Sequence, residues 1–212
     1  MVLSAAVAGG AATATPFPDP AADHPLSAEK TEESIVLAGG CFWGVQAVFQ
    51  HTKGVISATS GYAGGSAKTA KYEIVSSGTT GHAESVRVVY DASRITLGRL
   101  LKIFFSIAHD PTELNRQGPD VGTQYRSAIF YSGDGQRKIV DAYVAQLNTA
   151  GVFRRQIVTQ VAPLEAFYAA EAYHQDYADK HPFDPYILIN DRPKVDNLRK
   201  SYPTVYVDTP RR

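Results

Sequence analysis

The feature that most constrains the fold of this 212-residue chain is a short apolar run that ends in two glycines and leads into helical spacing. The run spans residues 34–38, and its length and composition predict a buried strand that stops at a tight turn. After the turn, Phe42, Val45 and Phe49 recur at the spacing of one helix face. The sequence therefore predicts a strand–turn–helix unit, with the folded part of the chain beginning near residue 34.

The only cysteine and the only tryptophan of the chain lie at this turn, as Cys41-Phe42-Trp43. Unpaired backbone N–H groups and the helix dipole favour negative charge at a helix N-terminus. We therefore expect the Cys41 thiol to ionise more easily than a free one and to act as a nucleophile. Phe42 and Trp43 offer apolar faces for a small apolar group of a ligand. The alternative is that Cys41 is only a small buried hydrophobe.

Composition excludes several classes of function. Hydrophobic residues make up 44% of the chain, which is typical of a globular protein with a sizeable core. The 21 basic and 21 acidic residues balance, so nothing favours nucleic acid or an anionic membrane as partner. A single cysteine excludes an intramolecular disulfide and a thiolate-rich zinc site, and the six histidines show no paired ligand spacing. We expect no metal site.

The N-terminal residues do not look like part of the folded domain. Residues 1–15 are apolar and small, and Ala12-Thr13-Ala14 resembles a signal-peptidase site, but no positively charged region precedes it. The segment is either the remainder of an export signal, which predicts a periplasmic or otherwise exported protein, or the flexible tail of a cytoplasmic one. Residues 16–33 are proline-rich and predict a disordered linker. The expected organisation is a tail over 1–33 and one domain over 34–212.

Strands and helices are expected to alternate along the domain. Residues 83–90 alternate in period two with apolar residues on both faces, which predicts a central strand. The expected strands are 34–38, 55–62, 83–90, 127–131 and 156–161, and the expected helices begin at Phe42 and cover 96–109, 135–150 and 167–181. Residues 182–212 contain five prolines and predict an irregular coil with one helical turn.

Three residues outside the turn have side chains suited to chemistry. Glu84 shares a covered strand face with Val86 and Val88, and a carboxyl group removed from water keeps its proton to higher pH and can act as a general acid. The alternative is a strand-edge glutamate that reaches solvent. Tyr72, in isolation, favours packing on a sheet face. Tyr125 ends a polar, glycine-punctuated loop of the kind that carries function.

Six motifs together resemble the A-type peptide methionine sulfoxide reductases, in a single-cysteine form. They occur in the order of that family and cover roughly residues 34–190. The resemblance implies an α/β (α+β) two-layer sandwich, with a mixed β-sheet of ferredoxin-like plait and helices packed against it. The motifs are GCFWG at 40–44, GYAGG at 61–65, GHAE at 81–84, HDP at 109–111, GTQYRS at 122–127 and YHQDY at 173–177.

The resemblance also implies roles for individual residues. Cys41 is similar to the nucleophile that attacks the sulfoxide sulfur, and Glu84 to the acid that protonates the sulfoxide oxygen. Tyr72 and Tyr125 resemble the hydroxyl donors that hold that oxygen. Attack on sulfur builds negative charge on oxygen, so that proton and hydrogen-bond donors belong on this side of the substrate.

By the same resemblance, Phe42 and Trp43 form the walls of the pocket for the S-methyl group, and Asp120 positions the substrate. The expected substrate is the S epimer of methionine sulfoxide, free or in oxidised proteins under repair, and the expected state is a monomer. The product on Cys41 would be a sulfenic acid. Because no second cysteine exists, an external thiol must resolve it, such as thioredoxin, glutaredoxin or glutathione, or dithiothreitol in vitro. No bound cofactor is expected.

Two other functions remain open from the sequence. A cysteine hydrolase or acyltransferase would need a base beside the thiol, for which His82 and His174 are candidates. A carboxyl group in an apolar setting, as at Glu84, suits proton donation better than the orientation of an imidazole. The other function is a non-catalytic module that binds oxidised methionine. Cys41→Ser distinguishes it from the enzymes, because binding should survive this substitution and turnover should not.

Overall fold

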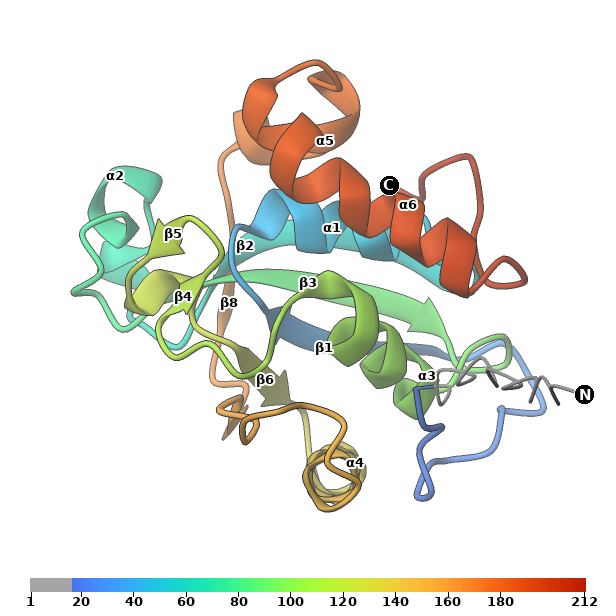
Figure 1. Ribbon diagram of the computed structural model, residues 1–212. Helices are drawn as coiled ribbons and strands as arrows, with labels where there is room; N and C mark the ends of the chain where they lie inside the picture. The colour runs from blue at the N-terminus through green and yellow to red at the C-terminus, as the bar shows by residue number, and fades with distance from the viewer. Residues whose placement is uncertain (1–16) are drawn as a thin grey trace, which may run out of the picture.

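The computed structural model describes residues 17–212, which build a six-stranded mixed sheet in the order β7-β6-β1-β3-β2-β8 (Figure 1). Neighbouring strands run antiparallel except β6 and β7, which are parallel. A separate hairpin is formed by β4 and β5. The strands are β1 (Glu32–Ala38), β2 (Val55–Ala63), β3 (Ala83–Asp91), β4 (Arg116–Gln117), β5 (Asp120–Val121), β6 (Ala128–Tyr131), β7 (Gln160–Pro163) and β8 (Phe167–Ala169).

Two crossover units interlock at the centre of the sheet. In the β1–α1–β2 unit, β3 lies between the two strands, and in the β3–α3–β6 unit, β1 lies between them. This is the split βαβ arrangement of a ferredoxin-like plait, so the expected fold class is confirmed. The α-helices are α1 (Phe42–Gln50), α2 (Tyr72–Val75), α3 (Leu97–Ile103), α4 (Asp134–Thr149), α5 (Tyr177–Lys180) and α6 (Arg192–Ser201).

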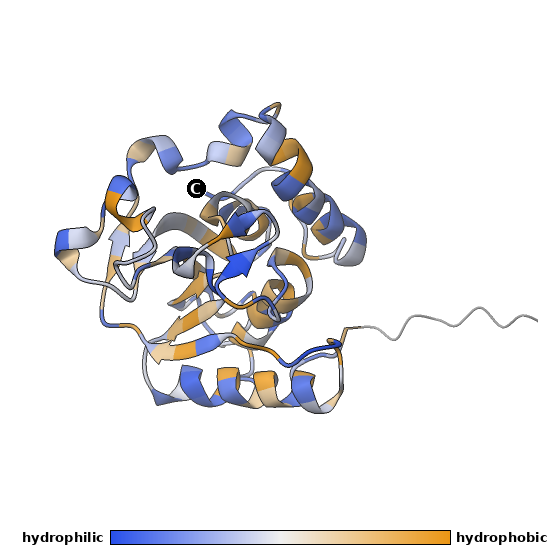
Figure 2. Cartoon of the chain, turned by 60° about the vertical axis from the view of Figure 1, so that its left-hand side comes forward, coloured by the Kyte–Doolittle hydropathy of each residue, from blue (hydrophilic) through white to orange (hydrophobic). Residues whose placement is uncertain are grey.

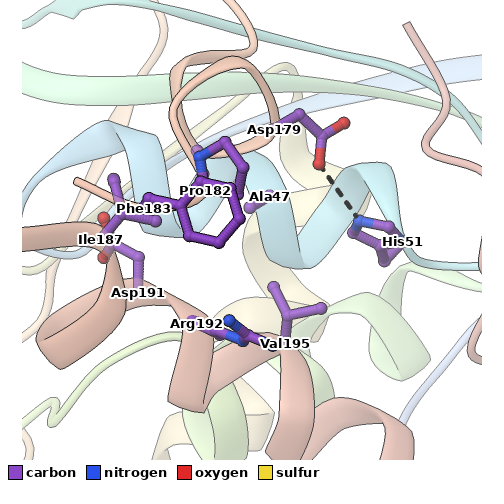
Figure 3. A pocket seen from close by; sticks show the side chains of 10 residues that line it. Ala47, His51, Asp179, Pro182, Phe183, Ile187, Asp191, Arg192 and Val195 are labelled. Carbon is purple, nitrogen blue, oxygen red and sulfur yellow. Dashed lines mark ion pairs between the residues drawn. The ribbon is translucent and has the colours of Figure 1, made fainter.

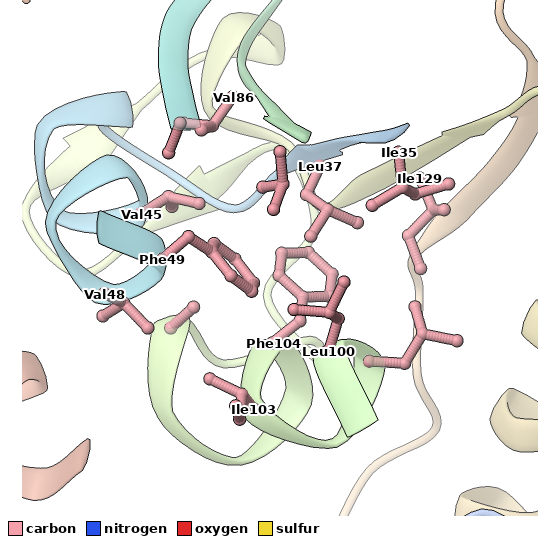
Figure 4. Packing of buried hydrophobic residues seen from close by; sticks show 14 of the residues in the cluster. Ile35, Leu37, Val45, Val48, Phe49, Val86, Leu100, Ile103, Phe104 and Ile129 are labelled. Carbon is pink, nitrogen blue, oxygen red and sulfur yellow. The ribbon is translucent and has the colours of Figure 1, made fainter. Parts of the chain in front are cut away.

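The main core lies between one face of the sheet and the helices (Figure 4). Along β1, Ile35 and Leu37 join the cluster that contains Phe49 and Phe104, whereas Val36 and Ala38 belong to a smaller cluster. This division follows from the period of two in a strand, which sends alternate side chains to opposite faces. The long helix α4 likewise turns an apolar stripe inward and a polar one outward (Figure 2).

The expected disordered linker is wrong for residues 17–31. The Tyr143 hydroxyl donates to the Pro18 carbonyl at 2.7 Å, and the Gly98 amide donates to Asp23 at 3.0 Å. Asp19 forms an ion pair of 2.7 Å with Lys102. These contacts hold the proline-rich segment against α3 and α4. The predicted signal remnant at residues 1–15 lies outside the described residues.

The C-terminal third of the chain differs most from expectation. The helix expected over 167–181 is instead β8, a short 3₁₀ turn and α5, because β8 pairs with the edge of β2 and Asp176 takes a left-handed φ of 59°. The tail expected to be coil contains a π-helical turn (Ile187–Asp191) that continues into α6. Pro193 lies in the first turn of α6, where its missing N–H is not needed, and Leu198 is buried.

Other elements are close to those expected. The helix expected over 96–109 is α3 followed by a π-helical turn (Phe104–Ala108). The strand expected at 156–161 is shifted to β7, and Tyr72 lies at the start of α2 and not on a sheet face. None of the helices in residues 17–212 combines the length and the apolar character needed to cross a bilayer.

Candidate active site

Cys41 occupies the N-cap position of α1, at the end of the turn that follows β1. Its side chain is buried, with 8% exposed. The turn depends on Gly40, which has a φ of +88° and whose Cβ, if present, would lie 2.6 Å from the Gln117 side chain. The predicted strand–turn–helix unit around the cysteine is therefore confirmed.

The ionisation expected for Cys41 is wrong for the substrate-free protein. Burial raises the pKa of the thiol well above its ordinary value, and the nearby charges of Glu84 and Asp191 raise it further. These effects outweigh the hydrogen bond from the Trp43 backbone N–H at the helix N-terminus, which lowers the pKa. At neutral pH, Cys41 is consequently a protonated thiol in the substrate-free protein.

Glu84 lies on β3 beneath the start of α1. Its side chain is 3% exposed, and its Oε2 accepts a hydrogen bond of 3.1 Å from the Phe42 backbone N–H. Burial raises its pKa to about 8, despite this hydrogen bond. The placement of Glu84 on a covered face is confirmed, and at neutral pH its carboxyl group holds a proton that it can donate.

Tyr72 and Tyr125 approach the same region from two different loops. Tyr72 begins α2, and Tyr125 ends a 3₁₀ turn (Thr123–Tyr125). Burial raises the pKa of both phenols, followed by the influence of the Glu84 charge, and Cys41 adds to both. Both phenols therefore keep their protons at neutral pH, and their role as donors to a substrate stays a prediction.

Aromatic rings enclose the site on the side of α1. Trp43 stacks on Tyr177 with 3.8 Å between ring centroids, and its Nε1 donates to His174 Nδ1 at 3.2 Å. Phe42 lies 5.0 Å from the His174 ring. Cys41 and Phe42 share one buried cluster against which Trp43 packs, and the pocket for a methyl group stays a prediction.

Asp120 lies on β5 and accepts a hydrogen bond from the Tyr186 hydroxyl. Tyr186 also packs edge-on against Trp43, with centroids 5.9 Å apart. Sequence reasoning missed Tyr177 and Tyr186 as neighbours of the site because it placed them in a helix and a coil. The aromatic-rich motif at 173–177 was the one available signal.

The base that a cysteine hydrolase needs is not found beside Cys41. His82 Nε2 lies 3.0 Å from the Ser66 carbonyl oxygen, and His174 Nδ1 accepts from Trp43. Neither imidazole forms a hydrogen bond with Cys41, so the hydrolase alternative receives no support. Among residues 17–212, no group of three His, Cys, Asp or Glu side chains could hold a metal ion.

A comparison with known families decides which of the functions open from the sequence applies. The family model described as peptide methionine sulfoxide reductase matches residues 33–205. The chain belongs to this family. It is therefore an oxidoreductase.

Relatives in this family match over most of their length. The chain is 53% identical over 178 residues to peptide methionine sulfoxide reductase MsrA 2 of Mesorhizobium japonicum, covering 84% of this chain and 91% of that protein. It is 46% identical over 206 residues to MsrA 2 of Synechocystis sp., covering 94% and 96%.

Solved structures of the family share the fold. Mxr1 from Saccharomyces cerevisiae in reduced form superposes with a TM-score of 0.65 at 34% identity, covering 77% of this chain and 92% of that one. Methionine sulfoxide reductase A of Corynebacterium diphtheriae gives a TM-score of 0.63 at 34% identity, covering 79% and 90%.

A cavity of about 300 Å³ lies beside the reductase site, between α1, α5 and α6 (Figure 3). Cys41 does not line it, so it is separate from the sulfur. Asp191 does line it, and this buried carboxylate pairs with Lys194 at 3.1 Å. A Cβ added to Gly44 would overlap Asp191 Oδ1, which explains why α1 carries glycine there.

Proposed function

We propose that the protein reduces the S epimer of methionine sulfoxide to methionine, free or within oxidised proteins, with Cys41 as nucleophile and Glu84 as acid. The observation that carries this proposal is the hydrogen bond from the Phe42 amide to Glu84. It ties the proton donor to the residue that follows the nucleophile. A proton donor on β3 is thereby held at the start of α1, where Cys41, Phe42 and Trp43 follow one another.

The first half of the reaction transfers oxygen to the enzyme. The Cys41 sulfur attacks the sulfoxide sulfur and forms a sulfur–sulfur bond, while the sulfoxide oxygen takes the Glu84 proton and becomes a hydroxyl group. That hydroxyl group then moves to the Cys41 sulfur, as the sulfur–sulfur bond and the bond between oxygen and the substrate sulfur both break. Methionine leaves with its sulfur reduced by two electrons, and Cys41 is oxidised to a sulfenic acid. The thiol proton that Cys41 gives up replaces the proton that Glu84 donates, so the proton count balances.

The protonation states of the free site fit this sequence of events. Attack places negative charge on the oxygen, and a neutral carboxyl group with a pKa of about 8 can neutralise it at physiological pH. The Tyr72 and Tyr125 hydroxyl groups add hydrogen bonds to the same oxygen. The S-methyl group needs only the apolar wall of Phe42 and Trp43.

The second half of the reaction needs a thiol from another molecule, because the chain has only one cysteine. An external thiol attacks the sulfenic acid, water leaves, and a mixed disulfide forms. A second thiolate then cleaves that disulfide and restores Cys41. Thioredoxin, glutaredoxin and glutathione all carry the required group.

Turnover of separated S and R epimers of a methionine sulfoxide peptide, with dithiothreitol as reductant, tests the proposal. We expect loss of the S epimer alone and no turnover by Cys41→Ser. If the serine variant turned over the S epimer at the rate of the native protein, Cys41 would not be the nucleophile. If the native protein bound the peptide without turnover, the binding module would be the better account.

A further inference from the structure

Glu171 is held close to the candidate site by the edge of the sheet. It follows β8 by two residues, and β8 pairs with β2 through Gly61 and Ala169. The Ala170 amide extends this pairing with a hydrogen bond of 2.9 Å to the Ser60 carbonyl. The backbone that leads to Glu171 is therefore held against β2.

The Glu171 carboxylate accepts two hydrogen bonds from different elements. Its Oε1 accepts from the Tyr72 backbone N–H at 3.0 Å, and its Oε2 accepts from the Tyr62 hydroxyl at 2.8 Å. Both partners are far from Glu171 in sequence, at separations of 99 and 109 residues. One side chain thus joins three segments of the chain.

The first of these hydrogen bonds holds the backbone at the start of α2, which carries the Tyr72 ring. Tyr72 is the first residue of α2, a helix of four residues, which is too short to be stable on its own. A carboxylate at the N-terminus satisfies one of its free N–H groups and complements its dipole. The residue before it, Lys71, makes no side-chain cap, so Glu171 takes that role.

The second hydrogen bond reaches a residue that packs beside Phe42. The Tyr62 side chain is fully buried, and its ring lies 5.9 Å from that of Phe42. Phe42 in turn donates its backbone N–H to Glu84. Glu171 therefore binds the backbone of the proposed hydroxyl donor, Tyr72, directly. It reaches Phe42, in the proposed methyl pocket, through Tyr62.

We infer that Glu171 is a positioning residue for the reductive step, which holds the Tyr72 hydroxyl at the sulfoxide oxygen by capping α2 while Tyr62 anchors the carboxylate. The inference rests on the proposed function, because it assigns Glu171 an effect through Tyr72. A carboxylate can serve both partners because each of its oxygens accepts hydrogen bonds. An amide keeps both contacts only if its oxygen faces the Tyr72 N–H and the Tyr62 hydroxyl turns to accept from its nitrogen, and it lacks the negative charge that complements the α2 dipole.

The test isolates the reductive step from reductant chemistry. The rate of methionine formation is measured in a single turnover with the S epimer and no reductant, for Glu171→Gln, Tyr72→Phe and the double variant. We expect Glu171→Gln to lower this rate roughly tenfold in the native background, as for a displaced catalytic group. In the Tyr72→Phe background we expect less than about a twofold further loss, because the affected hydroxyl is already gone.

Glu73→Gln provides the matched control, since it makes the same change at an exposed residue of α2. We expect it to leave the rate unchanged. Equal losses from Glu171→Gln in both backgrounds would overturn the inference, because they would indicate a general structural role. An unchanged single-turnover rate in both Glu171→Gln and Tyr72→Phe would overturn the inference as well.

Hydrogen exchange of the Tyr72 amide gives a readout that does not depend on activity. We expect faster exchange of this amide in Glu171→Gln, and in Glu171→Ala, with exchange in β3 unchanged. If the native protein showed no turnover, the proposed function would fail while this measurement still decided the capping role. Unchanged exchange of the Tyr72 amide would refute that role whatever the activity.

Discussion

Replacement of Glu84 by glutamine should change how the stability of the protein depends on pH. Glu84 is 3% exposed, and burial raises its pKa from an ordinary value of 4.5 to about 8. The glutamine amide is neutral at every pH, has nearly the same shape, and keeps an oxygen for the Phe42 amide. The variant thus resembles the protonated native protein and lacks its titration.

The sign and size of the effect follow from linkage. Between about pH 5 and pH 8, native Glu84 holds a proton that the unfolded chain has lost, so the stability that it contributes is present at low pH and lost as pH rises. Each pH unit in this window costs about 1.4 kcal/mol, or about 4 kcal/mol over three units. Relative to the native protein, Glu84→Gln should gain that amount across the window.

The assay is urea unfolding of both proteins at a series of pH values across this window. The difference between their free energies of unfolding is the quantity to plot, because it cancels the other titrating groups, including His51 and His109. Glu165→Gln, at an exposed position, serves as the control and should give a flat difference. A flat difference for Glu84→Gln as well would show that Glu84 is ionised in the folded protein, and the proton donor would have to be sought elsewhere.

Two further predictions concern how the C-terminal and N-terminal segments hold the body of the protein. Gly44→Ala should lower the free energy of unfolding by about 1–3 kcal/mol in urea, because the new methyl group would overlap Asp191 and lie 2.7 Å from Lys194 Nζ; an unchanged or higher stability would show that α6 can move away freely. Asp19→Asn should lower the free energy of unfolding by about 1 kcal/mol, because the buried Lys102 ammonium loses its charged partner. Equal stability of the variant and the native protein would mean that the Asp19–Lys102 ion pair does not stabilise the fold.

Local patterns were sufficient to predict the centre of the fold. The strand–turn–helix around Cys41 and the alternation of β3 are set by side-chain period and glycine, which act over a few residues. Glu84 could be placed on a covered face for the same reason. These elements form the central strands and the helix on which the candidate site is built.

Sequence patterns failed where distant contacts decide the structure. Residues 167–169 become a strand because the edge of β2 is available to pair with them, and nothing in their own sequence specifies that edge. Residues 17–31 are ordered by partners on α3 and α4. The two hydrogen bonds of Glu171 bridge about a hundred residues each and could not be read from spacing.

The prediction of a lowered pKa for Cys41 was wrong for an electrostatic reason. A helix N-terminus lowers the pKa of an exposed thiol, but here the sulfur is buried next to two carboxyl groups. The sequence contained both Glu84 and the C-terminal acid Asp191, yet only the fold brings them to the cysteine. The raised pKa of the Cys41 thiol and the raised pKa of Glu84 have the same main cause, because both groups are buried away from water.

The measurement that tests the central claim most directly is a single turnover with no reductant present. Native protein is mixed with excess S epimer, methionine is counted, and the mass of the peptide containing Cys41 is determined with and without a sulfenic-acid trap. We predict one equivalent of methionine per chain and one oxygen atom, accessible to the trap, on Cys41. Methionine formed without any change at Cys41 would contradict the account.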